Sequence, residues 1–134
     1  MPMTADTDTL VLPKRILVID DEESIRLLLD EYLEIIGFEV HSVASGPEGL
    51  KALANEEFGL IICDVSMPGM DGFQVFEEAV KSKPDQQFLF ITGYNYAGSR
   101  ENLIEKSLGL LRKPFHLNDL HAFISSIYPD IQKA

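Results

Sequence analysis

Two hydrophobic patterns alternate along the chain. Short apolar runs rich in β-branched residues predict buried strands, and longer segments with apolar positions three or four residues apart predict amphipathic helices. The predicted strands span residues 15–20, 38–43, 59–64, 87–92 and 108–111. The predicted helices span residues 24–36, 45–55, 73–83, 99–107 and 117–127. The pattern therefore predicts five strand–helix pairs joined by short loops.

Capping and turn residues support these boundaries. Gly37 stands where the first predicted helix ends, and Pro84 ends the third. Ser45, followed three residues later by Glu48, is a capping box that begins the second helix.

The order of the elements predicts the fold class. Continuously apolar strands separated by helices are typical of a parallel sheet covered by helices on both faces. Right-handed crossovers leave few topologies for five such units, so we expect a flavodoxin-like, doubly wound α/β fold with strand order 2-1-3-4-5 and five helices. Ligands of such sheets bind outside the carboxyl ends of the strands. The residues that follow each predicted strand are therefore the functional candidates.

The length fits one domain with a tail at each end. Residues 1–13 show neither a helical nor a strand period and are expected to form a flexible N-terminal tail. Residues 14–128 are expected to form the domain, and residues 129–134 a short C-terminal tail. Because so little follows the last predicted helix, we expect a stand-alone domain without a DNA-binding module in these 134 residues.

Charge and composition exclude several classes of protein. The chain has 22 acidic and 11 basic residues, which gives a formal net charge of −11. A field of that sign repels phosphate backbones and anionic lipids, so we expect neither nucleic-acid binding nor membrane insertion. The single cysteine cannot form an internal disulfide, which favours a reducing, cytoplasmic location. No apolar run approaches the ~20 residues of a membrane span, and the N-terminus lacks a signal-peptide pattern.

Residues with chemical function follow four of the five predicted strands. Asp20 and Asp21 end the first strand, Asp64 the third and Thr92 the fourth, and the fifth runs into Lys113. The predicted topology brings all of them to one edge of the sheet. Crowded carboxylates repel one another unless a cation is present, and oxygen ligands of this kind suit Mg²⁺. With a lysine and a hydroxyl beside them, they make a site that can form an aspartyl phosphate.

The same motifs carry a resemblance to a known family. An acidic pair (Asp20-Asp21), the segment D-V-S-M-P-G-M-D-G (64–72), Thr92-Gly93 and K-P-F (113–115) occur in order, each after its predicted strand. Between residue 14 and about residue 128, the chain resembles the receiver domain of bacterial two-component response regulators. The resemblance implies a signalling switch in a phosphorelay. By the same resemblance, such a switch would catalyse its own phosphoryl uptake and slow dephosphorylation, and it is not expected to be an enzyme with a separate substrate.

The resemblance also implies a metal site. Asp21 and Asp64 would bind Mg²⁺ directly, and Asp20 would act largely through water. The backbone carbonyl of Ser66 would be a further ligand.

A phosphoryl site is implied beside the metal. Asp64 would accept the phosphoryl group from a phosphohistidine on a sensor histidine kinase or a histidine phosphotransfer protein. Lys113 would pair with the phosphoryl oxygens, and Thr92 would move inward to hydrogen-bond them. The backbone N–H groups of Ser66 and Gly93 would complete the cradle. The movement of Thr92 would present a new surface to a downstream protein target.

One departure from the family pattern concerns the switch. The family often has Tyr or Phe three residues before the lysine, where this chain has Leu110. Tyr94 and Tyr96, near Thr92, are candidates to replace that aromatic residue. In family members, the residues at the positions of Ser66 and Tyr94 line the path of the water that attacks the aspartyl phosphate. Tyr94 is therefore expected either to slow this hydrolysis or to be an exposed aromatic residue that faces a partner.

Three alternative functions belong to other classes. An aspartate-nucleophile phosphohydrolase typically needs an acid two residues after the nucleophile, where this chain has Ser66. A flavodoxin-type FMN binder needs a phosphate loop after the first strand, where the acidic residues 20–23 would repel the phosphate. A receiver-like adaptor that acts without phosphorylation is disfavoured by the intact acidic site, although Leu110 is compatible with it.

The remaining candidates have simpler interpretations. Glu22 and Glu23 are expected to favour the helix dipole in a first turn. Cys63 is expected to be a small buried core residue. The three histidines lack metal-ligand spacing and an obvious acidic partner, and are assigned to solvent or core: His41, His116 and His121.

Overall fold

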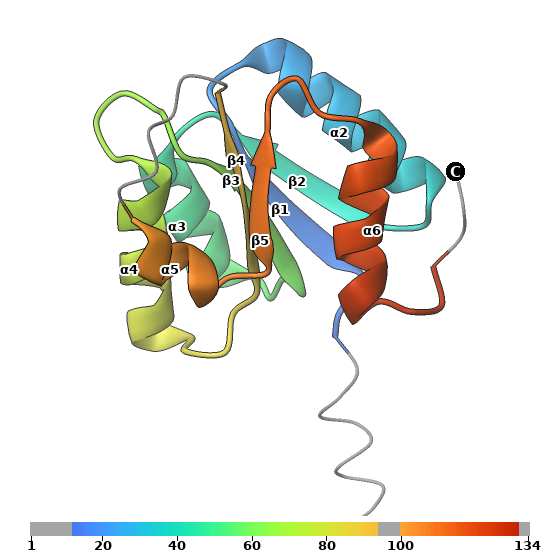
Figure 1. Ribbon diagram of the computed structural model, residues 1–134. Coiled ribbons are helices and arrows are strands. Elements are labelled where there is room, and N and C mark those ends of the chain that lie inside the picture. The colour runs from blue at the N-terminus through green and yellow to red at the C-terminus, as the bar shows by residue number, and fades with distance from the viewer. Residues whose placement is uncertain (1–11, 94–99, 132–134) are drawn as a thin grey trace, which may run out of the picture.

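Five parallel strands form a single sheet in the order β2-β1-β3-β4-β5 (Figure 1). The computed structural model describes residues 12–93 and 100–131. The strands are β1 (Arg15–Ile19), β2 (Glu39–Val43), β3 (Leu60–Asp64), β4 (Phe88–Thr92) and β5 (Gly109–Arg112). The helices are α2 (Glu23–Ile35), α3 (Gly46–Asn55), α4 (Gly72–Ser82), α5 (Glu101–Glu105) and α6 (Leu117–Ile127). The predicted fold class and strand order are confirmed.

Helices cover both faces of the sheet, α2 and α6 on one side and α3, α4 and α5 on the other (Figure 1). Side chains alternate between these faces along each strand. Ile16 and Val18 of β1 belong to one buried apolar cluster, and Leu17 and Ile19 to the other. Because helices bury both faces of the sheet, the strands are continuously apolar, as the sequence pattern predicts.

One predicted helix is too long. Instead of residues 99–107, α5 covers Glu101–Glu105, and residue 99 lies outside the described part of the chain. The chain must leave the helix by Leu108, because the Leu108 N–H donates to the carbonyl of Phe88 at 2.7 Å and begins the pairing of β5 with β4. A helical period does not register this tertiary demand.

Helix starts follow local capping chemistry. The hydroxyl of Ser45 accepts a hydrogen bond from the Glu48 N–H at 3.3 Å and caps α3, as predicted. The Glu48 side chain accepts from the Ala44 N–H at 3.1 Å, not from the Ser45 N–H, so the reciprocal half of the predicted box does not form. Asp71 caps α4 in a reciprocal box with Gln74, whose side chain accepts from the Asp71 N–H at 2.8 Å. This reciprocal box fixes where α4 begins, directly after the loop that follows β3.

The two ends of the domain are joined by a tyrosine. The hydroxyl of Tyr128 donates to the carbonyl of Pro13 at 2.6 Å, and a Cβ at Gly59 would lie 1.8 Å from that hydroxyl oxygen. Leu12 and Ile131 pack against the same apolar cluster. Most of the two predicted tails, residues 1–11 and 132–134, lies outside the described residues.

None of the helices in residues 12–93 and 100–131 is both long and apolar enough to cross a bilayer.

Candidate functional site

Four strands deliver polar residues to the same edge of the sheet. Asp20 follows β1, Asp64 and Thr92 are the last residues of β3 and β4, and Lys113 follows β5. The strand register aligns these ends, since Ile19 pairs with Cys63 and Asp64 with Ile91. In a parallel sheet, strands that end in register place their next residues side by side.

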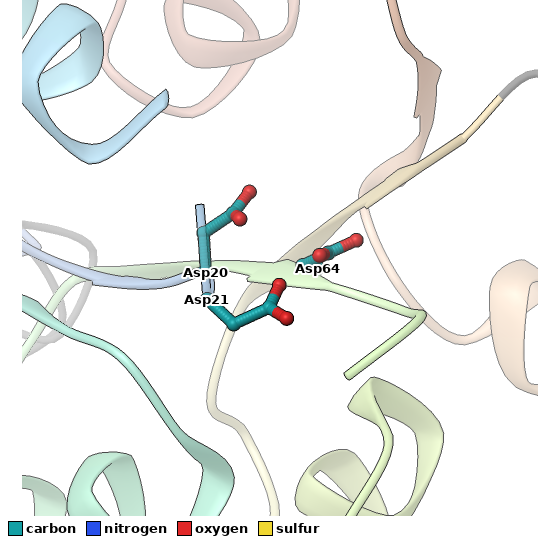
Figure 2. Close-up of side chains that lie close together, drawn as sticks. All are labelled: Asp20, Asp21 and Asp64. Carbon is teal, nitrogen blue, oxygen red and sulfur yellow. The ribbon is translucent and has the colours of Figure 1, made fainter. Parts of the chain in front are cut away.

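Three carboxylates meet at the ends of β1 and β3 (Figure 2). One oxygen of each of Asp20, Asp21 and Asp64 lies within 4.8 Å of the others. Asp20 and Asp64 are only 1% and 3% exposed, whereas Asp21 faces solvent. The cluster is thus open on one side, which suits a cation that keeps part of its water shell.

Burial and mutual repulsion shift the titration of the acids. The pKa of Asp64 is raised to about 7, first because the carboxyl is buried and then because Asp20 lies close, while Lys113 opposes the shift. The pKa of Asp20 is also raised, chiefly by burial, although the Glu22 N–H donates to its Oδ1 at 2.8 Å. Burial therefore opposes the ionisation of both acids, the charge of Asp20 further opposes that of Asp64, and a divalent cation would relieve this.

Lys113 reaches the acidic cluster from the end of β5, the edge strand of the sheet. Its Nζ lies 3.2 Å from Asp20 Oδ2 and 3.5 Å from Asp64 Oδ2, and it makes a shorter contact with Glu22 Oε1. Burial alone would lower the pKa of Lys113, but these carboxylates outweigh burial and raise it. The ammonium is therefore charged at neutral pH and shared among three acids.

Thr92 places a buried hydroxyl in the same region. The residue is fully buried, and its Oγ1 makes no hydrogen bond with any described residue. Its carbonyl accepts from the Lys113 N–H at 2.7 Å, so the backbones of the two residues are joined. A buried hydroxyl without a partner is unfavourable, so Thr92 Oγ1 is available to donate to a group outside the described residues.

The loop after β3 holds the backbone close to Asp64. A Cβ at Gly72 would lie 2.3 Å from the Asp64 carbonyl oxygen, so only glycine fits there. Gly69 has φ of +77°, a left-handed conformation that other residues rarely adopt. The Ser66 N–H, at the start of this loop, donates to Asp64 Oδ1 at 3.3 Å.

The remaining predicted residues have the following positions. Gly93 directly follows β4 and is half-buried. Leu110 lies on β5 and packs against the apolar cluster under α3, α4 and α5. Cys63 is fully buried in β3, as predicted. Tyr94 and Tyr96 lie outside the described residues.

Two side-chain contacts depart from the sequence analysis. Glu22 is the N-cap residue of α2, outside its first turn, and it contacts Lys113. Glu23 does occupy the first turn, as expected. His41 has an acidic partner after all, because its Nδ1 lies 3.2 Å from Glu56 Oε2. Neither contact follows from a local sequence pattern, because each joins residues that are far apart in the sequence. For the contact between Glu22 and Lys113, the only available signal was that Glu22 is an acidic residue next to the Asp20-Asp21 pair.

Comparison with known proteins gives concordant matches. CpdR, a response regulator receiver protein of Brucella abortus, is 35% identical over 80% of this chain and 90% of its own. The "Probable transcriptional regulator ycf27" of Porphyridium aerugineum is 35% identical over 90% of this chain but 50% of its own, so the chain spans about half the length of that relative. The solved structure of the response regulator TrrA of Thermotoga maritima, in complex with Mg²⁺-BeF, aligns with a TM-score of 0.75 and 32% identity over 84% of this chain and 97% of that one.

The match to a family spans nearly the whole described domain. Residues 16–125 match the response regulator receiver domain. That range contains the three clustered aspartates, Thr92 and Lys113. The chain therefore belongs to the response regulator receiver domain family, whose members serve two-component signalling.

Proposed function

We propose that this domain is a phosphorylation switch whose acceptor is Asp64. The observation that carries the proposal is the meeting of three carboxylates, one lysine and one buried hydroxyl that has no partner among the described residues, all at a single edge of the sheet. The phosphoryl donor is a phosphohistidine on a sensor histidine kinase or a histidine phosphotransfer protein. The domain then acts on no separate substrate and catalyses only its own phosphorylation and slow dephosphorylation.

The transfer is a substitution at phosphorus. An Asp64 carboxylate oxygen forms a bond to the phosphorus, the phosphorus–nitrogen bond of the donor breaks, and its electron pair returns to the imidazole. Lys113, 3.5 Å from Asp64 Oδ2, is placed to offset the charge on the phosphoryl oxygens. The Thr92 hydroxyl and the Ser66 and Gly93 N–H groups are the donors for the remaining oxygens.

The donor atoms at the site fit Mg²⁺. Carboxylate oxygens within 4.8 Å of one another are hard ligands, and the buried Asp20 Oδ2 accepts no aligned hydrogen bond from a described residue. We assign direct ligation to Asp21, Asp64 and the Ser66 carbonyl, with Asp20 acting through water. When bound, the metal neutralises charge on the transferring group. The similar protein TrrA was solved in complex with Mg²⁺-BeF, which supports the choice of Mg²⁺.

The surface beside the site supports a protein donor. Helix α2 starts directly after the acidic pair and exposes three large apolar side chains, Leu27 (61% exposed), Leu28 (41%) and Ile35 (61%). Exposed apolar groups of this size on one helix are typical of contact surfaces. Because α2 also carries Glu31 and Glu34, we expect an apolar partner surface rimmed by basic residues.

Two alternative reactions are less well supported. The position two residues after Asp64 is Ser66, which is exposed and cannot act as the general acid of a phosphohydrolase. The buried Asp20 and Asp64 would repel the phosphate of FMN at the same edge of the sheet. A colourless purified protein would agree with the absence of flavin.

A phosphate mimic tests the proposal without a partner protein. Beryllofluoride with Mg²⁺ should shift the amide NMR signals of Thr92 and Gly93 in the wild type. Asp64→Asn and excess chelator should each abolish the shifts, because the mimic bonds to the Asp64 carboxylate and needs the metal. Unchanged spectra of the folded wild-type protein at saturating mimic would overturn the proposal.

A further inference from the structure

We propose that Glu22 is a positioning residue that competes with the incoming phosphoryl group for Lys113, and so slows phosphorylation. The inference rests on the proposed function of Asp64 and adds a residue outside the acceptor and metal groups. It starts from the closest carboxylate contact of Lys113, which is made with Glu22 and not with the acceptor.

The contact joins two distant parts of the chain at the rim of the site. Glu22 precedes α2 and Lys113 follows β5, 91 positions further along. The lysine side chain is 15% exposed, whereas that of Glu22 is 55% exposed. The lysine ammonium therefore faces the buried Asp20 and Asp64 on one side and contacts the carboxylate of Glu22 at the solvent-exposed edge of the site.

The backbone around Glu22 is fixed. Its N–H donates to Asp20 Oδ1 at 2.8 Å, and its carbonyl accepts the first helical hydrogen bond, from the Arg26 N–H at 3.1 Å. These bonds determine the direction in which the Glu22 side chain leaves the backbone. Glu23, one residue later, is helical and exposed, and within the described residues it forms no ion pair with Lys113.

The competition follows from the way the ammonium group is held. Lys113 Nζ has three carboxylates around it, those of Glu22, Asp20 and Asp64, and among the described residues its hydrogen bond is made with Glu22. A phosphoryl oxygen on Asp64 that attracts the ammonium therefore competes first with the Glu22 carboxylate. Glu22 is the carboxylate that water can solvate, so its contact is the one expected to break. Its negative charge also repels an anionic donor at the rim.

Three variants separate the contact from the charge. Glu22→Gln removes the charge and weakens the contact, whereas Glu22→Asp keeps the charge on a shorter side chain. Glu23→Gln removes a charge from the next residue without touching Lys113. We expect Glu22→Gln and Glu22→Asp to take up a phosphoryl group from acetyl phosphate about two to five times faster than the wild type. The effect is this small because an ion pair with an exposed partner has only modest strength. Glu23→Gln should match the wild type.

A second readout reports on the lysine directly. Hydrogen exchange of the Lys113 ammonium, followed by NMR in the unphosphorylated protein, should be faster in both Glu22 variants and unchanged in Glu23→Gln. A merely structural role of Glu22 in the start of α2 would leave that exchange unchanged. Thermal unfolding of each variant checks that the fold is retained.

The possible outcomes distinguish this inference from the proposed function. If the wild type is phosphorylated and both Glu22 variants react at its rate or more slowly, the competition is wrong and the function of Asp64 stands. If Glu22→Gln and Glu23→Gln accelerate equally and Glu22→Asp does not, net charge is responsible and the inference is again wrong. If no variant, including the wild type, takes up a phosphoryl group, the proposed function fails and the inference fails with it.

Discussion

The environment of the Asp64 carboxyl opposes its negative charge. The residue is 3% exposed, and its pKa is raised from the ordinary 3.8 to about 7, first by burial and then by Asp20. Between these pH values, the folded protein holds a proton at Asp64 that the unfolded chain has released. The free energy of unfolding of the metal-free protein should therefore fall as pH rises through that range.

Replacing the acceptor tests this pH dependence. Asp64→Asn cannot ionise, so we expect the metal-free variant to match the wild type near pH 4 and to become more stable at higher pH. At pH 8 the gain should be between about 1 and 4 kcal/mol, because a pKa that is higher by one in the folded protein corresponds to about 1.4 kcal/mol. Urea unfolding in chelator across this pH range measures it.

A matched substitution serves as the control for that experiment. Asp85→Asn changes an exposed aspartate outside the site and should leave the pH profile unchanged. Parallel profiles for the wild type and Asp64→Asn would contradict the assignment of the raised pKa to Asp64.

Thr92 allows function and stability to be separated at one residue. Its hydroxyl is buried without a partner among the described residues. Thr92→Val keeps the shape and removes the hydroxyl, so the free energy of unfolding should stay equal or rise by about 1 kcal/mol. The affinity for beryllofluoride with Mg²⁺ should fall about tenfold, because a hydrogen bond to a charged group is lost. A less stable variant with unchanged affinity would contradict both expectations.

At the scale of elements, the exposed apolar side chains of α2 lead to a prediction about the donor. Leu27→Gln combined with Ile35→Gln should slow transfer from the cognate phosphohistidine protein about tenfold or more, because each removes exposed apolar area from the proposed contact. Phosphorylation by acetyl phosphate should be unchanged, since a small donor needs no docking surface. An equal loss with both donors would contradict a docking role for α2.

The elements also show what the sequence could predict. The strands were predictable because both faces of the sheet are buried, which leaves continuous apolar runs such as Leu60–Asp64. The site was predictable because parallel strands ending in register bring their following residues together, so the positions of Asp20, Asp64 and Lys113 along the chain were enough.

What the sequence could not predict depends on tertiary contacts. The early end of α5 is set by a hydrogen bond from Leu108 to β4. The contact of Glu22 with Lys113 depends on how the start of α2 faces the end of β5, and no local pattern carries that information. The pairing of His41 with Glu56 likewise joins β2 to the residue after α3.

At the scale of the whole molecule, a layered scaffold supports a strongly acidic surface. Apolar clusters on both faces of the sheet fix the strands, so the strand ends hold the site in a defined geometry. The formal net charge of −11 favours a cation at the site and repels a free anionic phosphodonor. Uptake from a small donor should therefore become faster with added salt, whereas its dependence on Mg²⁺ should remain.

The central claim is that Asp64 accepts one phosphoryl group in a metal-dependent reaction. The most direct test is the intact mass of the protein after incubation with acetyl phosphate and Mg²⁺, at moderate ionic strength. We predict one added phosphoryl group on the wild type, mapped to Asp64, and none on Asp64→Asn or with excess chelator. A folded wild-type protein that gains no phosphoryl group, or a group that persists in Asp64→Asn, would contradict the account.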